Sequence, residues 1–174
     1  MNECPAEEKS AGPPTTKETT TMGYSTTFDG HVTVTPPLNP HEIIFLRRFA
    51  DSRCHRRPEG PYSTRDYAYN EVERGNYNLP PEGQPGLWCD WEPTDDGAGI
   101  RWNYSEKFYE ATAWMQYLID HFLKPGAAAK GQPGFEDFTF DHVVNGVIHA
   151  QGDEPGDSWE LTVTNNQASG ESSR

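Results

Sequence analysis

The amino-acid sequence predicts an α+β fold in which an antiparallel sheet carries two helices on one face. Strand-type segments, in which apolar and polar residues alternate, occur near both ends of the chain and in its middle. Two segments with apolar residues at helical spacing lie between them. The order is strand, helix, strand, strand, helix, strand, strand. Its first six elements follow the βαββαβ order of ferredoxin-like domains, and a sheet of this kind would bury both helical stripes.

The folded part is expected to be a single α+β domain over residues 22–167 of a chain of 174. Residues 1–21 and 168–174 are mainly small, polar or charged, so we expect them to be disordered tails. The hydrophobic fraction of the chain is only 33%, but the deficit lies at these two ends. The remaining part is large enough to bury one core.

The first strand is expected over residues 24–35, where Val32 and Val34 alternate with threonines. Asp29-Gly30 interrupts this run. The pair either closes a hairpin or marks a bulge in one long strand. We favour the bulge, because the arms of a hairpin here would be short.

A helix is expected to begin just after Asn39. The Asn39 side chain can cap it, Pro40 suits its first position, and Glu42 can reach back to complete a capping box. The helix extends to about Arg53, because apolar residues continue at helical spacing. These residues are Ile43, Leu46 and Ala50.

Residues 54–85 are expected to form a long irregular loop, because they are rich in Arg, Pro, Gly, Tyr and Asn and show no period. Loops of this length are often functional. Its tyrosines either form a binding surface among the arginines or pin the loop to the sheet. They are Tyr62, Tyr67, Tyr69 and Tyr77.

Two strands and a second helix are expected after the loop. The strands span about 86–92 and 99–103, and turn-forming residues at 94–97 join them. Ser105 is placed to cap a helix over about 106–124, which carries a wide apolar stripe.

The last two strands are expected over 138–151 and 159–164, with an acidic turn at 153–157 between them. Asn145-Gly146 interrupts the first of these strands. This dipeptide is a strong hairpin signal, and a bulge is the alternative.

Three short stretches give the chain a distinctive pattern. They read GQPGLWCDW over residues 83–91, EKFY over 106–109 and YLIDHFL over 117–123. In these stretches the chain resembles a set of small bacterial and bacteriophage proteins that carry no assigned activity, and the resemblance covers roughly residues 22–165. It implies one intact small domain and a phage or mobile-element origin, and it supplies no catalytic residue.

The formal net charge of −13 disfavours non-specific binding to nucleic acid or to anionic membranes. It favours solubility, a basic partner or mimicry of a polyanion. The three cysteines form no even set, and no apolar run approaches the length of a signal-peptide core or a membrane span. We therefore expect a cytoplasmic protein with free thiols and no membrane association.

No catalytic, metal-binding or cofactor-binding pattern is evident in the sequence. No histidine pair has the spacing of a zinc-protease helix, and no paired-cysteine knuckle occurs. Folding could still bring His121, His142 and Cys89 together, but ordinary core or surface histidines are the simpler interpretation. Paired carboxylates lie in turns and linkers, where they are usually solvated. We therefore predict no metal, cofactor or catalytic residue, and we favour a protein that is not an enzyme.

Cys54 is the candidate nucleophile that stands out. Its neighbours are three arginines and a histidine: Arg53, His55, Arg56 and Arg57. These cations would lower the pKa of the thiol if it were exposed. An ordinary thiol near a helix end is the alternative, and we favour it.

Six arginines lie within residues 47–65 and form the strongest feature of the sequence. Arginines with interleaved tyrosines suit a nucleotide or a single-stranded nucleic acid, because charges contact phosphates and rings stack on bases. The alternative is that these arginines pair with the acidic surplus of the protein and hold the loop in place. The net charge favours the alternative, since it opposes the approach of a polyanion.

Acidic residues gather at 92–96 and 153–160. An acidic protein of phage type could imitate nucleic acid and occupy a basic site on another protein. A solvated face that keeps the protein soluble is the simpler interpretation.

These observations favour a non-enzymatic accessory protein that binds another protein through the 54–85 loop and exposed aromatic residues of the sheet. Binding of a nucleotide or nucleic acid through the arginines is the alternative, followed by polyanion mimicry and by a Cys/His enzyme. The candidate binding residues are Arg53, Arg56, Arg57, Arg65, Tyr67, Trp88 and Trp102.

Overall fold

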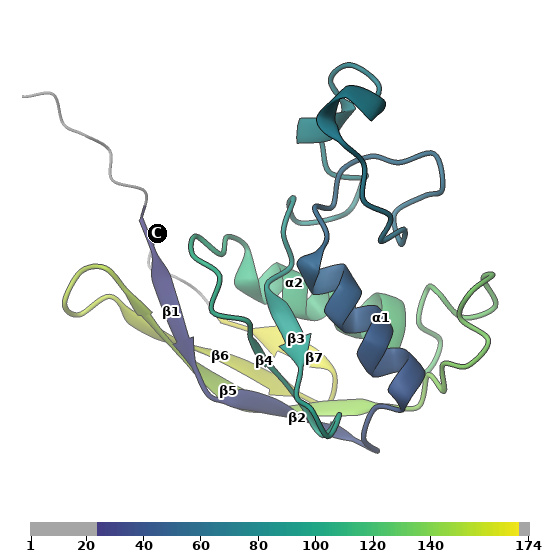
Figure 1. Cartoon of the computed structure of the whole chain (residues 1–174). Coiled ribbons are helices and arrows are strands. Elements are labelled where there is room, and N and C mark those ends of the chain that lie inside the picture. The colour runs from purple at the N-terminus through teal and green to yellow at the C-terminus, as the bar shows by residue number, and fades with distance from the viewer. Residues whose placement is uncertain (1–23, 171–174) are drawn as a thin grey trace, which may run out of the picture.

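The computed structural model describes residues 24–170. It is an α+β fold with a seven-stranded antiparallel sheet and two helices, α1 and α2, on the same face of that sheet (Figure 1). The tail expected at 1–21 lies outside the described residues. No helix within residues 24–170 is long and apolar enough to cross a membrane.

The elements follow one another in the expected general order, with one more strand at the end. The strands are β1 Thr26–Asp29, β2 His31–Thr35, β3 Trp91–Pro93, β4 Gly99–Trp102, β5 Val143–Gly152, β6 Ser158–Thr164 and β7 Gln167–Ser169. The helices are α1 Pro40–Asp51 and α2 Ala111–Leu118, and α2 continues into a π-helical turn, Ile119–Leu123. In the sheet the strands lie in the order β3-β4-β2-β5-β6-β7, and β1 pairs with β5.

β1 and β2 behave as one long strand that bends at Gly30. Both pair with β5, and Asp29 opposite His149 and Val32 opposite Gly146 belong to the same unbroken register. The register contains no extra residue, so the interruption is a bend and neither a bulge nor a hairpin. Gly30 makes the bend with a φ of +98°, which glycine adopts without strain.

The hairpin expected at Asn145-Gly146 is absent, because β5 runs straight through both residues. Gly146 has a φ of +148°, and a Cβ at this position would lie 2.9 Å from the Cα of Val32. The glycine therefore serves the close approach of β2. The Asn145 side chain accepts the backbone N–H of Asn165 at 2.8 Å and fixes the turn after β6.

β7 was not expected from the sequence. Asn165 and Asn166 both have positive φ, at 46° and 68°, and together they return the chain into a short hairpin. β7 then pairs with β6, so the sheet extends to Ser169, two residues into the range expected as a tail.

α1 carries the expected capping box. The Asn39 side chain accepts the backbone N–H of Glu42 at 3.0 Å, and the Glu42 carboxylate accepts the N–H of Asn39 at 3.0 Å. Pro40 occupies the first helical position. The helix ends at Asp51, close to the expected boundary.

Three other boundaries differ from the expectation. β5 begins at Val143 and not at 138. α2 begins at Ala111, because the preceding residues Tyr104, Lys107 and Glu110 have positive φ and cannot continue a helix. Ser105 is therefore not its cap. β3 begins at Trp91. Before it, the Leu87 carbonyl accepts the N–H of Cys54 at 2.7 Å, so this part of the expected strand bonds to the 54–85 loop, whereas the Asp90 carbonyl accepts the N–H of Asn103 at 2.9 Å.

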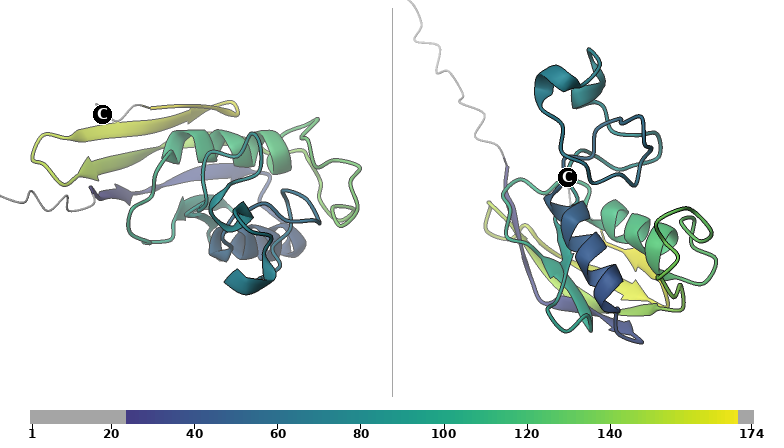
Figure 2. Two further views of the ribbon diagram at one scale, coloured as in Figure 1. Left: turned by 90° about the horizontal axis from the view of Figure 1, so that it is seen from above. Right: turned by 45° about the vertical axis from the view of Figure 1, so that its right-hand side comes forward.

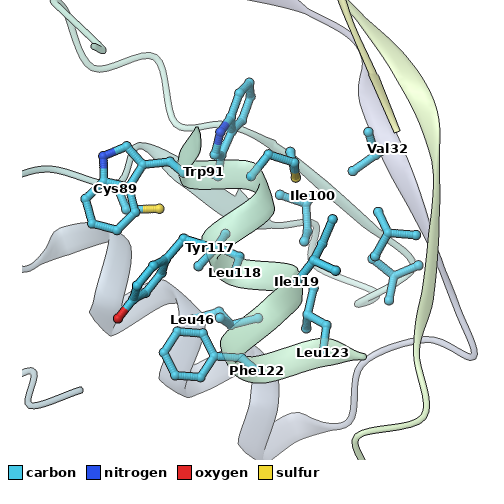
Figure 3. Packing of buried hydrophobic residues seen from close by; sticks show 14 of the residues in the cluster. Val32, Leu46, Cys89, Trp91, Ile100, Tyr117, Leu118, Ile119, Phe122 and Leu123 are labelled. Carbon is cyan, nitrogen blue, oxygen red and sulfur yellow. The ribbon is translucent and has the colours of Figure 1, made fainter. Parts of the chain in front are cut away.

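One hydrophobic core fills the space between the sheet and the helices. Val32, Val34 and Ile148 are almost fully buried on the helix-facing side, and the residues between them in sequence face outward. Figure 3 shows Ile119 on the side of Ile100 and Val32, with Phe122 beside Leu46 of α1. The apolar stripes predicted for both helices are the surfaces that this core buries.

Candidate functional site

Residues 54–85 form a lobe that projects away from the sheet beyond the end of α1 (Figures 1 and 2). The lobe contains two single turns of 3-10 helix, Tyr69–Glu71 and Asn76–Asn78, and is otherwise irregular. Arg53 and Trp88 flank its two ends in the sequence. We use the term lobe for residues 54–85.

Arg57 holds the lower part of the lobe together through backbone carbonyls. Its guanidinium donates to the carbonyls of Arg53 at 2.7 Å, Ser63 at 2.8 Å and Arg65 at 3.0 Å. One planar group thus satisfies three backbone acceptors in a segment that has no ladder of its own. All three guanidinium nitrogens of Arg57 therefore donate to acceptors within the protein.

Arg53, which directly precedes the lobe, binds the segment Tyr77–Asn78 near the other end of the lobe. Its Nε donates to the Tyr77 carbonyl at 3.1 Å and its Nη2 to Asn78 Oδ1 at 2.7 Å. The same guanidinium lies over the Tyr77 ring, 4.6 Å from its centroid, and 5.9 Å from that of Trp88. Trp88, Arg53 and Tyr77 therefore form one stack.

The stack continues into an exposed surface. The Tyr69 ring meets the Tyr77 ring edge-on at 5.2 Å and is 72% exposed, and Trp88 is 44% exposed. Leu79, next to the Asn78 that Arg53 binds, is also exposed. We call Arg53, Tyr69, Tyr77 and Trp88 the aromatic patch.

A cavity of about 470 Å³ opens beside the patch. Its wall includes His55, which is buried under the rings of Tyr67 and Tyr77 and bonds to the Arg56 carbonyl through Nδ1 (2.9 Å). Both charge signs line it: Arg56, Arg57, Glu71 and Glu73. Residues 53–85 contain five arginines and five acidic residues, so this region does not share the net negative charge of the chain.

Arg65 and Tyr67 form a small cluster of their own with Glu59. The Tyr67 hydroxyl donates to the Glu59 carboxylate, and this bond raises the pKa of Tyr67 and lowers that of Glu59. Arg65 contacts the same carboxylate at 3.4 Å and lies 4.8 Å from the Tyr67 ring centroid. Arg56 donates to the Pro80 carbonyl at 3.3 Å. The candidate arginines therefore act mainly within the lobe.

Trp102 is the one proposed aromatic contact that the structure removes from the surface. It is 8% exposed, packs edge-on against Phe28 at 5.7 Å, and donates its Nε1–H to the Ser105 carbonyl at 3.1 Å. Alternate residues of a strand share a face, so Trp102 joins Ile100 on the core side of β4. Trp102 is therefore no exposed anchor of the sheet, and the little of it that is accessible lines a cavity beside β1.

Cys54 is not an activated thiol. It is 1% exposed, and burial raises its pKa to about 12 even though Arg57 acts in the opposite direction. The lowered pKa that its basic neighbours suggested would require solvent access. Cys89 is likewise fully buried, and burial raises its pKa.

The histidines considered for a metal have other partners. His142 contacts Glu42 at 2.9 Å, and His121 bonds to the Tyr62 hydroxyl at 2.6 Å. Within residues 24–170, no group of three or more His, Cys, Asp or Glu side chains is placed to hold a metal ion.

Two members of the patch, Tyr69 and Tyr77, were not singled out from the sequence as binding residues. Both were recognised as loop tyrosines, but nothing in the local pattern separates an exposed ring from one that pins the loop. Their position depends on Arg53, which is distant in sequence and meets them only after folding. Searches of protein-family models, curated proteins and solved structures found no match to this chain.

Proposed function

We propose that the protein is a non-enzymatic accessory protein that binds another protein through the aromatic patch of the lobe. The observation that carries this proposal is the stack of Trp88, Arg53 and Tyr77, extended outward by Tyr69. Tryptophan, tyrosine and arginine are the residue types that dominate binding energy at protein interfaces.

The patch is also held in place before any partner arrives. Arg53 is fixed by the Tyr77 carbonyl and by Asn78, and the base of the lobe is fixed by the three bonds of Arg57. A surface that is already ordered loses less conformational entropy on binding. This favours a docking surface over a loop that folds around its ligand.

A nucleic acid is the second candidate for the same surface. The Arg53 guanidinium over the rings of Tyr77 and Trp88 favours it, because single-stranded nucleic acids bind to combinations of arginine and aromatic side chains. Against it, Arg56 and Arg57 donate to internal carbonyls, and the lobe has five acidic residues against four arginines. The net charge of −13 further opposes a polyanion, so a protein partner is the better supported proposal.

We also propose that the fold is ferredoxin-like. The bent strand β1–β2 lies between β4 and β5, and β3 lies on the far side of β4, which supports a split βαβ arrangement. β6 and β7 would then be additions at one edge. Both helices on one face support the same assignment.

The proposal is tested with a photo-crosslinking amino acid placed at position 69 of the full chain, in lysate treated with nuclease. We expect one protein to crosslink, and the crosslink to be lost in Trp88→Ala. Ile44→Ala is the matched control, because Ile44 is a 52% exposed apolar residue on α1, outside the lobe. A crosslink that survives Trp88→Ala, or one formed to nucleic acid in untreated lysate, would contradict a protein-binding patch.

A further inference from the structure

β1 has a free edge within residues 24–170. β4 pairs with β2 over residues 31–33 and contacts β1 only through side chains, as between Trp102 and Phe28, whereas the backbone of β1 pairs with β5 alone. The bend at Gly30 turns β1 away from β4 (Figure 1). The edge of a strand without a neighbour presents backbone N–H and C=O groups that an additional strand can bind.

Two cavities flank this edge, and the Phe28 ring borders both. One, of about 430 Å³, lies between β1, the segment 108–112 and Trp159. The other, of about 450 Å³, lies between β1, β5 and the segment that contains Trp102 and Tyr104. Successive side chains of a strand point to opposite faces, so two cavities beside one strand edge suit alternate side chains of an added strand.

Exposed aromatic rings stand at the two cavities. Tyr104 is 72% exposed and its ring contacts that of Trp102 at 5.2 Å, and Tyr109 is 61% exposed. Trp159 is half-buried and meets Phe28 edge-on at 5.9 Å. These rings give the cavities apolar walls on a face that is otherwise acidic.

The segments around the edge are strongly acidic. Residues 24–29, 103–112 and 149–160 contain seven carboxylates and a single lysine, Lys107. The carboxylates are Asp29, Glu106, Glu110, Asp153, Glu154, Asp157 and Glu160. Asp29 and Glu110 each line one of the two cavities. This charge favours a ligand that carries positive charge.

We propose that the β1 edge binds an extended, basic segment of a partner protein, which adds to the sheet as a further strand. Backbone bonds to β1 would hold the segment, its apolar side chains would enter the cavities, and its Lys or Arg residues would face Asp29 and Glu110. This surface is separate from the aromatic patch, so neither proposal depends on the other.

A second copy of this chain is a poorer occupant of the same edge. Pairing two β1 strands would bring two sets of seven carboxylates together. Like charges in this number oppose association. The acidic surroundings thus select a basic partner over self-association.

The test is a selection of random decapeptides on the immobilised full chain. Enriched peptides should be basic, with apolar residues at alternate positions. The tightest one is then titrated into ¹⁵N-labelled protein. We expect shifts of the amides of residues 26–29 and 104–110, and binding at least tenfold weaker to Asp29→Asn/Glu110→Gln. Glu73→Gln/Glu82→Gln, which removes two exposed carboxylates from the lobe, should leave the affinity unchanged.

A proline analogue of the same peptide separates strand addition from simple charge attraction. Proline at its centre removes a backbone donor and keeps the charge, so affinity should fall at least tenfold. Equal affinity of the two peptides, shifts confined to the lobe, or a lack of enriched basic peptides would each overturn the proposal. A concentration-dependent dimer that peptide displaces would assign the edge to a second copy instead.

Discussion

Glu42 and His142 form a buried ion pair that joins the start of α1 to the residue before β5. His142 Nε2 lies 2.9 Å from Glu42 Oε2, and both side chains are at most 1% exposed. The other ring nitrogen, Nδ1, donates to the Pro36 carbonyl at 2.7 Å. The Glu42 carboxylate also accepts the N–H groups of Asn39 and Thr139 at 3.0 and 2.9 Å. Both charges are therefore compensated within the core.

This pair predicts an optimum of stability in mildly acidic solution. Burial alone would lower the pKa of His142, but the bonds to Glu42 and Pro36 outweigh it and raise the pKa above 6.5. Burial would raise the pKa of Glu42, but its bonds to His142 and two backbone N–H groups lower the pKa below 4.5. The contribution of His142 is complete below pH 6.5 and is lost as pH rises through its raised pKa. That of Glu42 is complete above pH 4.5 and is lost as pH falls through its lowered pKa.

The measurement is urea unfolding of the wild type and Glu42→Gln between pH 3 and pH 9. Glutamine can keep the bond to Asn39 through its amide oxygen, but its NH2 then replaces the oxygen that accepts the Thr139 N–H, so the variant removes one acceptor as well as the charge. The part of the difference that varies with pH therefore reports the ion pair. Its free energy of unfolding should fall by about 3 kcal/mol near pH 5.5 and by less at both extremes. A difference that is constant across this range would show that Glu42 and His142 are not ionised together in the folded protein.

A second prediction concerns Asp90, a buried carboxyl whose pKa is raised to about 6 by burial. The Asn103 amide, at 3.5 Å, opposes the shift only weakly. Because the folded pKa exceeds the ordinary value of 3.8, the ionised group destabilises the fold above pH 6. Asp90→Asn should therefore stabilise the protein by about 2 kcal/mol at pH 8.

The control for Asp90 is the same comparison at pH 4. The carboxyl is then neutral in the folded state, so Asp90→Asn should have little effect. Thermal unfolding of the wild type and Asp90→Asn at pH 4 and pH 8 measures the stability difference at each pH. Equal stabilisation at pH 4 and pH 8 would assign the effect to packing of the amide and not to the charge.

The third prediction tests why β5 needs glycine at position 146. A Cβ there would lie 2.9 Å from the Cα of Val32, whereas a Cβ at Gly156 meets nothing within 4 Å. Both glycines have positive φ, so alanine is strained at either site. Gly146→Ala should lower the free energy of unfolding by about 2 kcal/mol more than Gly156→Ala, because only Gly146→Ala forces β2 and β5 apart. Equal losses would show that φ alone requires the glycine.

The elements that depend on local chemistry were predictable from the sequence. The capping box placed the start of α1 at Pro40, and alternation of apolar residues located β2 and β6. The start of α2 was placed five residues too early. Tyr104, Lys107 and Glu110 adopt a positive φ, which residues of these types rarely do and which the sequence therefore did not predict.

Long-range relationships could not be predicted in this way. Asn145-Gly146 is a local hairpin signal, but in the structure the glycine allows the close approach of β2. The asparagine side chain binds the backbone of the turn after β6. The lobe was predicted as a long irregular loop. The binding of backbone carbonyls by its arginines was not predicted, because every residue has a carbonyl and the sequence does not show which carbonyl lies near an arginine.

The last prediction makes Cys54 a reporter of how Arg57 holds the lobe. Cys54 is buried and its pKa is raised to about 12, so it should react with thiol reagents only when the lobe opens. Arg57→Lys replaces a planar group that binds three carbonyls with a single ammonium on a flexible stem. Loss of two bonds at about 1 kcal/mol each should speed the labelling of Cys54 about tenfold or more.

Arg65→Lys is the matched control, because it changes only an exposed side chain that contacts Glu59 and keeps the Arg65 backbone carbonyl that Arg57 binds. Cys89 provides an internal standard, since it is fully buried and should stay unreactive in both variants. Labelling of Cys54 is read by mass spectrometry of the native protein. If Arg57→Lys and Arg65→Lys behaved alike, the three bonds of Arg57 would not be what keeps the lobe closed, and its other contacts, such as the Arg53 stack and the Tyr62–His121 bond, would suffice. The charge of Arg57 would then be free to serve a ligand in the adjoining cavity.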